Sequence, residues 1–185
     1  GTYGEALQTV RNGSSSLPIR LHAVSGAGSV MLTVPGRVLR VDHAYITVEG
    51  LVLDGQYGAA DTVDVNSGGH FLTLRDTEVR RSSRDLIDIA SPQGVLIERC
   101  LIHHALNAAD GRTDAHGIAA SAARDLTIRD TEIHTFSGDG FQIDPDRGAP
   151  GWDRVTIEGS TIWLAPLPVA ESASVPSSPI PSTLA

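Results

Sequence analysis

Short segments of alternating apolar and polar residues recur along this chain. Each segment is rich in β-branched residues or leucine and ends on an aliphatic side chain. Period-two alternation with β-branched enrichment is typical of β-strands rather than helices. The segments start 23 to 31 residues apart and occupy residues 46–53, 72–79, 95–102, 126–133 and 155–162.

A second set of short apolar segments lies between the members of the first. Two sets of strands in a fixed order, with no helical pattern between them, predict a chain that coils repeatedly around one core. We therefore predict an all-β fold, a right-handed parallel β-helix of roughly six to eight coils, over residues 1–164. A β-propeller would need a longer repeat. The second set occupies residues 62–65, 86–89, 117–120 and 140–143.

The composition changes after Leu164. Residues 165–185 are rich in proline and serine and carry a single charge, Glu171. Such a composition predicts a linker or a disordered tail. A β-helix that ends near Trp163 leaves the strand edges of its last coil open, which favours self-association. We expect the chain to be a truncated or frame-shifted fragment of a longer β-helix.

Charge and composition exclude several classes of protein. The net charge of −8 and the pI of about 5.2 argue against a nucleic-acid partner, whose phosphates need a basic face. No segment approaches the ~18 apolar residues of a membrane-spanning helix, so no membrane partner is expected. All 14 basic residues are arginine, and the sequence contains no lysine.

Equivalent residues of successive coils lie about 4.8 Å apart in a parallel β-helix, so a column of the repeat becomes a row in space. The row of small residues that contains Cys100 is expected inside, which makes its thiol a buried group rather than a catalytic one. The row after the first set of strands is expected to face solvent, where it could bind a sugar chain; an ordinary solvated face is the alternative. This outer row consists of Asp54, Arg80, His103, His134 and Trp163.

Two further rows, at the start of the second set of strands, are rich in carboxylates. Asp61 and Asp64 lie three residues apart on one coil and stack over Asp85 and Asp88 on the next. Four like charges in a small area need a counter-charge, and oxygen ligands of this kind suit Ca²⁺. The sequence therefore predicts a calcium site formed by these aspartates, with compensation by nearby arginines or by solvent as the alternatives.

Two insertions flank these acidic rows, at residues 104–116 and 144–154. Long loops on a rigid scaffold commonly carry binding and catalytic residues. Arginine would bind the carboxylate of an acidic sugar, and histidine would transfer a proton. The catalytic candidates are His116, Arg112 and Asp139. The substrate-binding candidates are Asp144 and Arg147, together with Arg80, His103, His134 and Trp163.

Several motifs resemble those of a known family. The opening GTYGEALQTVRNGSSSLPIRLHA is similar to the first coils of secreted pectate-lyase-like β-helix proteins. The segments RDLIDI at 84–89 and GDGFQI at 138–143 resemble the D-D-G-F-D element of polysaccharide lyase family 9. The resemblance implies secretion and a Ca²⁺ ion held by aspartates. Asp85 and Asp88 match the element best, and Asp61 or Asp64 matches the acid one coil earlier.

The resemblance favours a carbohydrate-active, polysaccharide-lyase-like protein that acts on an acidic polysaccharide by Ca²⁺-assisted β-elimination. The base in that family is a lysine, which this sequence lacks, so Arg112 and His116 are the nearby candidates for the proton acceptor. Two alternatives stay open. One is a non-catalytic glycan-binding or structural β-solenoid. The other is a β-helix glycoside hydrolase, which needs two carboxylates about 5–10 Å apart.

Overall fold

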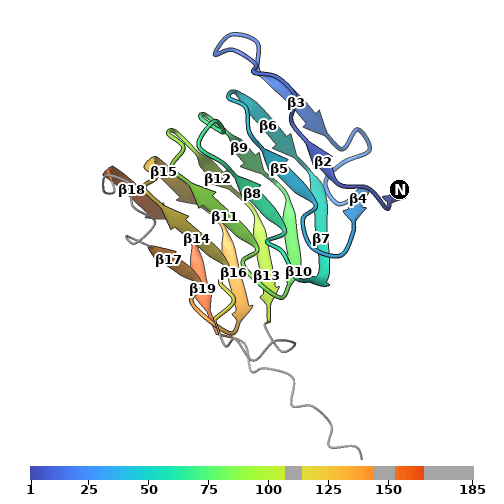
Figure 1. Cartoon of the computed structure of the whole chain (residues 1–185), viewed down its shortest axis with the longest axis vertical. Helices are drawn as coiled ribbons and strands as arrows, with labels where there is room; N and C mark the ends of the chain where they lie inside the picture. Colours follow the sequence, from blue (N-terminus) through green and yellow to red (C-terminus); the bar gives the residue numbers. More distant parts are fainter. Residues whose placement is uncertain (107–113, 144–152, 165–185) are drawn as a thin grey trace, which may run out of the picture.

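A computed structural model describes residues 1–106, 114–143 and 153–164, in which every regular element is a β-strand. The strands form three sheets, and all neighbouring strands within each sheet run parallel. The chain visits the three sheets in the same order on every coil, and Figure 1 shows the strands stacked coil upon coil. Six complete coils and one further strand are described, which confirms the predicted right-handed parallel β-helix.

Sheet 1 carries the outer row of arginine, histidine and tryptophan. Its strands are the longest on average in the middle of the chain, where the repeat is most regular. Sheet 1 consists of β1 (Thr2–Tyr3), β4 (Val30–Thr33), β7 (Leu51–Gly58), β10 (Glu78–Ser82), β13 (Leu101–Ala105), β16 (Glu132–Phe136) and β19 (Thr161–Trp163).

Sheets 2 and 3 complete each coil, and sheet 2 carries the acidic rows. Sheet 2 consists of β2 (Leu7–Gln8), β5 (Leu39–Val41), β8 (Val63–Val65), β11 (Ile87–Ala90), β14 (Ile118–Ser121) and β17 (Phe141–Ile143). Sheet 3 consists of β3 (Ile19–His22), β6 (Ile46–Glu49), β9 (Thr73–Arg75), β12 (Leu96–Glu98), β15 (Arg124–Arg129) and β18 (Asp153–Glu158).

The core is a set of aliphatic stacks that run along the axis of the coils. In sheet 1, Leu53, Val79, Ile102 and Ile133 lie in register on successive strands, and all four are completely buried. Each buried side chain of this size stabilises the fold by roughly 1.5–3 kcal/mol relative to an exposed one. The inward stacks therefore fix the register, since a slip of one residue would expose every member of a stack.

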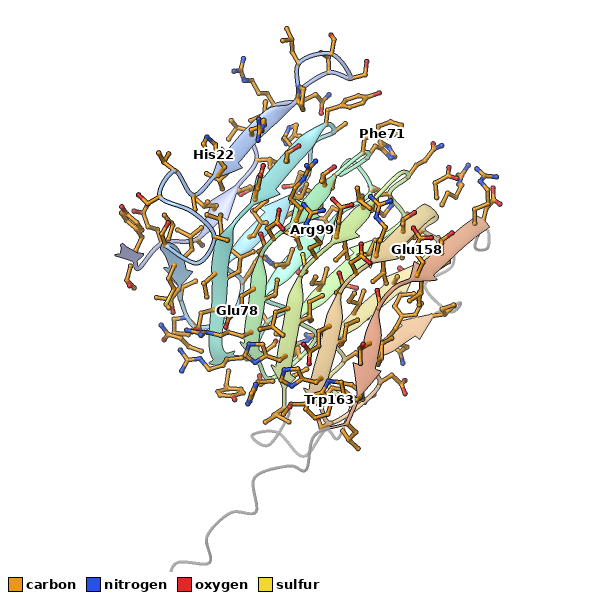
Figure 2. All side chains as sticks on the ribbon, turned by 180° about the vertical axis from the view of Figure 1, so that it is seen from behind. His22, Phe71, Glu78, Arg99, Glu158 and Trp163 are labelled. Carbon is orange, nitrogen blue, oxygen red and sulfur yellow. The ribbon has the colours of Figure 1, made fainter. Side chains whose placement is uncertain are left out.

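At five of the six described turns from sheet 3 to sheet 1, a single left-handed residue directly follows the strand of sheet 3; residues 23–29 make the other turn. A left-handed backbone at a single position lets two strands meet at a sharp corner, and glycine, aspartate and asparagine adopt it most easily. Arg99 occupies one of these turns, as Figure 2 shows, and its guanidinium binds both carboxylate oxygens of Asp76 on the previous coil, at 2.8 and 2.9 Å. The turn residues are Gly50, Asp76, Arg99, Asp130 and Gly159, with φ between 49° and 72°.

The residue after each turn points inward, and these residues form the expected interior row of small side chains. The amide N–H of Cys100 donates to Oγ1 of Thr131 at 3.2 Å, and the amide of Thr131 donates to Oγ of Ser160 at 3.1 Å. The hydroxyls of Thr131 and Ser160 thus each satisfy an amide of the neighbouring coil. Burial raises the pKa of the Cys100 thiol to about 12, so the cysteine is a structural group, as predicted.

The last described coil leaves several apolar side chains partly exposed. Ile143, Ile157, Ile162 and Trp163 each expose about two-fifths to one half of their surface. Self-association through this edge stays a prediction, because residues 165–185 lie outside the described part of the chain. None of the described residues forms a helix that is long and apolar enough to cross a membrane.

Candidate functional site

Three of the predicted aspartates form a compact group on sheet 2. Asp64 of β8 and Asp88 of β11 are direct neighbours across the two strands, and Asp61 lies in the turn that precedes β8. One carboxylate oxygen of each residue lies within 4.8 Å of the others. Stacking of two coils brings these groups together, as the repeat predicts, because equivalent residues of neighbouring coils are in register.

Arginines compensate part of this negative charge. Arg37 pairs with Asp64, and Nε of Arg84 lies 3.4 Å from Oδ1 of Asp61 without forming a hydrogen bond. Oδ1 of Asp64 is buried and has no hydrogen-bond partner. Burial raises the pKa of Asp64, the Arg37 charge opposes that rise, and the Asp61 and Asp88 charges add to it. A buried carboxylate oxygen without a partner, on a residue grouped with two more carboxylates, fits a divalent cation.

Asp85, the fourth predicted metal ligand, lies outside this three-carboxylate group. Its Oδ1 accepts the backbone N–H of His116 on the next coil at 3.0 Å, just as Oδ1 of Asp61 accepts the N–H of Asp85 at 3.1 Å. The pKa of Asp85 is raised to about 6. Burial is the main cause, the hydrogen bond from the His116 amide opposes the rise, and the Asp61 charge adds to it. The carboxylate of Asp85 is therefore used to join two coils.

His116 continues the same ladder of contacts. Its Nδ1 accepts the backbone N–H of Asp139 at 2.8 Å, and the ring is almost completely buried. A neutral imidazole in this arrangement keeps its hydrogen on Nε2, so its one lone pair is already engaged. Gly138 packs against the ring, where a Cβ would lie 2.7 Å from Nδ1. The ring is thus placed to donate a hydrogen bond from Nε2 rather than to accept a proton, and its catalytic role stays a prediction.

The remaining candidates near sheet 2 are less well defined. The carboxylate of Asp139 lies 3.7 Å from Nδ1 of His116 and is mostly exposed to solvent. Arg112, Asp144 and Arg147 lie outside the described residues. Their predicted roles in catalysis and substrate binding therefore stay predictions.

The outer row on sheet 1 is in register over four coils. Arg80 pairs with His103, His103 with His134, and His134 with Trp163, on strands β10, β13, β16 and β19. The rings of His103 and His134 stack with centroids 5.1 Å apart, and those of His134 and Trp163 stack at 4.8 Å. The rings of His103, His134 and Trp163 therefore stack on one another along the coils, and Trp163 at the end of the row is 41% exposed.

Asp54, the first member of this row, was expected to face solvent and is instead completely buried. Its carboxylate accepts hydrogen bonds from Nε of Arg80 at 2.8 Å, from Nε and a terminal nitrogen of Arg81 at 2.7 and 2.6 Å, and from the backbone N–H of Gln56 at 3.1 Å. Burial alone would raise the pKa of Asp54, but the hydrogen bonds from Arg81 and Arg80 lower it overall. The two arginines cover the carboxylate, which explains its burial.

Glu78 and the adjacent histidines complete the surface around this row. Oε1 of Glu78 accepts a hydrogen bond from Arg80 at 2.8 Å and lies 3.0 Å from Nε2 of His103. The two Nδ1 atoms of His103 and His104 are in direct hydrogen-bond contact. Figure 2 shows Glu78 and Trp163 on the strands of sheet 1, on different coils of the same face.

A depression of about 320 Å³ lies where sheet 1 turns towards sheet 2. The alternation pattern gave no indication of three of its residues, Tyr57, Arg81 and His104, because each has a left-handed backbone that adds one residue to the strand. The only sequence signal for this depression is that two arginines follow each other at residues 80–81 and two histidines at residues 103–104. The depression is lined by Tyr57, Arg80, Arg81, His103 and His104.

Comparison with protein-family models and with curated proteins gave no match. Among solved structures, a protein from Parabacteroides merdae that is described as a candidate glycosyl hydrolase has a similar fold. The match has a TM-score of 0.59 at 8% sequence identity and covers 87% of this chain and 81% of that chain. This similarity supports the β-helix fold. Membership of polysaccharide lyase family 9 is not confirmed.

Proposed function

We propose that this protein is a carbohydrate-active β-helix that cleaves an acidic polysaccharide by cation-assisted β-elimination on sheet 2. The observation that carries the proposal is the group formed by Asp61, Asp64 and Asp88, with its buried and unpartnered Asp64 oxygen. A polysaccharide substrate of this kind also favours the predicted secretion of the protein.

The residues present fit a Ca²⁺ ion. Three carboxylates supply hard oxygen ligands, and the positive charge would offset a repulsion that Arg37 and Arg84 compensate only in part. A bound Ca²⁺ would neutralise the carboxylate of a uronic acid and so make the adjacent C–H bond more acidic. Within that reaction, Arg37 and Arg84 would bind further sugar carboxylates, and the Nε2–H of His116 would donate a hydrogen bond to the leaving oxygen, which takes its proton from solvent. The proton of the C–H bond would pass to a base, for which Arg112 stays the predicted candidate.

The test measures release of unsaturated products by ultraviolet absorbance on polygalacturonate, alginate and a glycosaminoglycan, with Ca²⁺ and with EDTA. We expect Ca²⁺-dependent product from one of these substrates, and a loss of at least tenfold in Asp88→Asn. Asp130→Asn is the matched control, because Asp130 is an exposed turn residue with a left-handed backbone that asparagine tolerates. No product from any substrate would refute the elimination reaction.

Ca²⁺ binding is tested separately from turnover. At a concentration 100 times its dissociation constant, a ligand that binds only the folded state stabilises it by about 2.7 kcal/mol. We expect Ca²⁺ to raise the melting temperature of the wild type and of Asp130→Asn by several degrees, and to have no such effect on Asp88→Asn. Equal Ca²⁺ shifts in all three proteins would refute the assigned ligands.

A glycoside hydrolase is the second candidate. It is supported by the description of the Parabacteroides merdae protein and by carboxylates whose separation is close to the roughly 5 Å of retaining enzymes. Hydrolysis would release reducing ends without ultraviolet-absorbing products and without a need for Ca²⁺. Measuring reducing ends and absorbance on the same samples therefore distinguishes the two reactions.

A further inference from the structure

We propose that the depression on sheet 1, with the row that leads from it to Trp163, is a second glycan site that binds a carboxylate-bearing polysaccharide only when its histidines are protonated. The site lies on a different sheet from the aspartates and needs neither a cation nor turnover. It therefore does not rest on the proposed function.

The shape of the surface suits an extended chain. The depression of about 320 Å³ has room for a single sugar carboxylate and part of its ring, and two guanidinium groups line it. From there His103, His134 and Trp163 follow each other at ring spacings of 5.1 and 4.8 Å, about the length of one sugar unit. The indole of Trp163 is 41% exposed and is held by a hydrogen bond from its N–H to Glu132 at 2.9 Å, so its exposed part can pack against a sugar ring.

The charge of this surface reverses when the histidines are protonated. Strands β4 and β19 contribute no titratable side chain to it. The other strands contribute two arginines and three carboxylates, whose net charge is −1 while the histidines are neutral. Protonation of His103 and His104 changes this net charge to +1. The groups concerned are Asp54 and Tyr57 of β7, Glu78, Arg80 and Arg81 of β10, His103 and His104 of β13, and Glu132 and His134 of β16.

The surroundings keep two of these histidines neutral at pH 7. Burial lowers the pKa of His103, Glu78 opposes this, and the neighbouring His104 lowers it again. Burial and the charges of His134, Arg80 and Arg81 lower the pKa of His104. Both values therefore lie below the ordinary histidine pKa of about 6.5, whereas a sugar carboxylate, like an α-carboxyl group, ionises near pH 3.5. Opposite charges therefore coexist only at a pH that is below the lowered histidine pKa values and above that of the sugar carboxylate.

The contact between His103 and His104 gives an independent reason for an anionic ligand. With Nε2 of His103 directed at Glu78, one of the two facing Nδ1 atoms carries a hydrogen and the other accepts it. Once both rings are protonated, two N–H groups face each other and the contact becomes repulsive. An anionic oxygen placed between them would accept from both rings, so ligand binding and proton uptake favour each other.

The test measures binding of polygalacturonate by calorimetry with EDTA present, at pH 5.0 and pH 7.5. We expect about tenfold tighter binding at pH 5.0, equivalent to about 1.4 kcal/mol. Titrations in two buffers of different ionisation enthalpy should show proton uptake on binding. His104→Gln should lose most of the pH dependence. His22→Gln, which changes an exposed histidine on sheet 3, is the control for the change in overall charge and should retain it.

A second variant keeps the test informative if His104→Gln fails to fold. Glu78→Gln removes one negative charge from the surface and should bind polygalacturonate more tightly than the wild type at pH 7.5, which misfolding cannot produce. Asp88→Asn should retain the pH-dependent binding, so a failure of the function proposed for sheet 2 can be told apart from a failure of the site proposed on sheet 1. The proposal is overturned by equal affinity at both pH values, by unchanged pH dependence in His104→Gln, or by equally tight binding of a DNA oligonucleotide of matched charge.

Discussion

Replacing Asp54 by asparagine should destabilise the protein strongly, because this completely buried carboxylate holds two arginines at the corner of sheet 1. It accepts three charged hydrogen bonds, at 2.8, 2.7 and 2.6 Å, and one from a backbone amide at 3.1 Å. An asparagine keeps one acceptor oxygen and directs an NH₂ group at a guanidinium. At least two charged hydrogen bonds are lost, each contributing roughly 1.5–3 kcal/mol.

Part of that loss is recovered by water. The side chains of Arg80 and Arg81 are 26% and 43% exposed, so both guanidinium groups can be hydrated in the variant. We therefore expect Asp54→Asn to lower the free energy of unfolding by about 2–4 kcal/mol, at the lower side of the range for a broken buried pair. For a chain of this length that corresponds to a fall in melting temperature of about 5–15 °C.

Asp76→Asn is the matched control for this experiment. Asp76 also binds an arginine through both oxygens, at 2.8 and 2.9 Å, but its side chain is 32% exposed and its backbone is left-handed, which asparagine tolerates. An exposed pair contributes about 0–1 kcal/mol. Urea unfolding followed by circular dichroism measures both variants. Equal destabilisation by the two substitutions would refute the argument that burial makes the Asp54 pair important.

The interaction of Asp54 with its two arginines also predicts how the stability of the protein changes with pH. The pKa of Asp54 is lowered in the folded protein, so the folded state binds a proton less readily than the unfolded state does. Its stabilisation is fully present above the ordinary aspartate value of 3.8 and is lost as the pH falls through the lowered value. The difference in stability between wild type and Asp54→Asn should therefore shrink below about pH 4.

Three further predictions follow from the packing. Cys100 should not react with a thiol reagent at pH 8 until urea unfolds the chain, since its thiol is buried and its pKa is raised to about 12; rapid reaction of the native protein would contradict this. Gly58→Ala should destabilise the folded protein by more than about 2 kcal/mol in thermal melts, because a Cβ at this position would lie 2.0 Å from the backbone nitrogen of Gly36. Gly4→Ala is the control and should be nearly neutral, because a Cβ there would have no neighbour within 4 Å. Ile102→Ala should cost about 2–5 kcal/mol in urea unfolding, and a loss below 1 kcal/mol would show that the core collapses around the cavity.

The sequence by itself determined the architecture and the rows. A period-two pattern repeated every 23 to 31 residues with no helical pattern between the strands favours stacked parallel strands, and once the strands stack, the repeat itself sets the register. The neighbours His103, His134 and Trp163 were predictable for this reason, as was the juxtaposition of Asp64 and Asp88. The interior place of Cys100 follows from the same alternation.

Only the tertiary structure decided how individual polar groups are used. The left-handed residues Arg81 and His104 add one residue to their strands, and no alternation pattern reveals such a bulge. The sequence predicts a metal ligand at Asp85 and a solvent-facing acid at Asp54. The first is engaged by an amide of the next coil and the second by two arginines, because a buried donor without an acceptor is costly wherever the fold creates one. Which buried donors lack a backbone acceptor depends on the backbone geometry of neighbouring coils, and the sequence of a single coil does not contain that information.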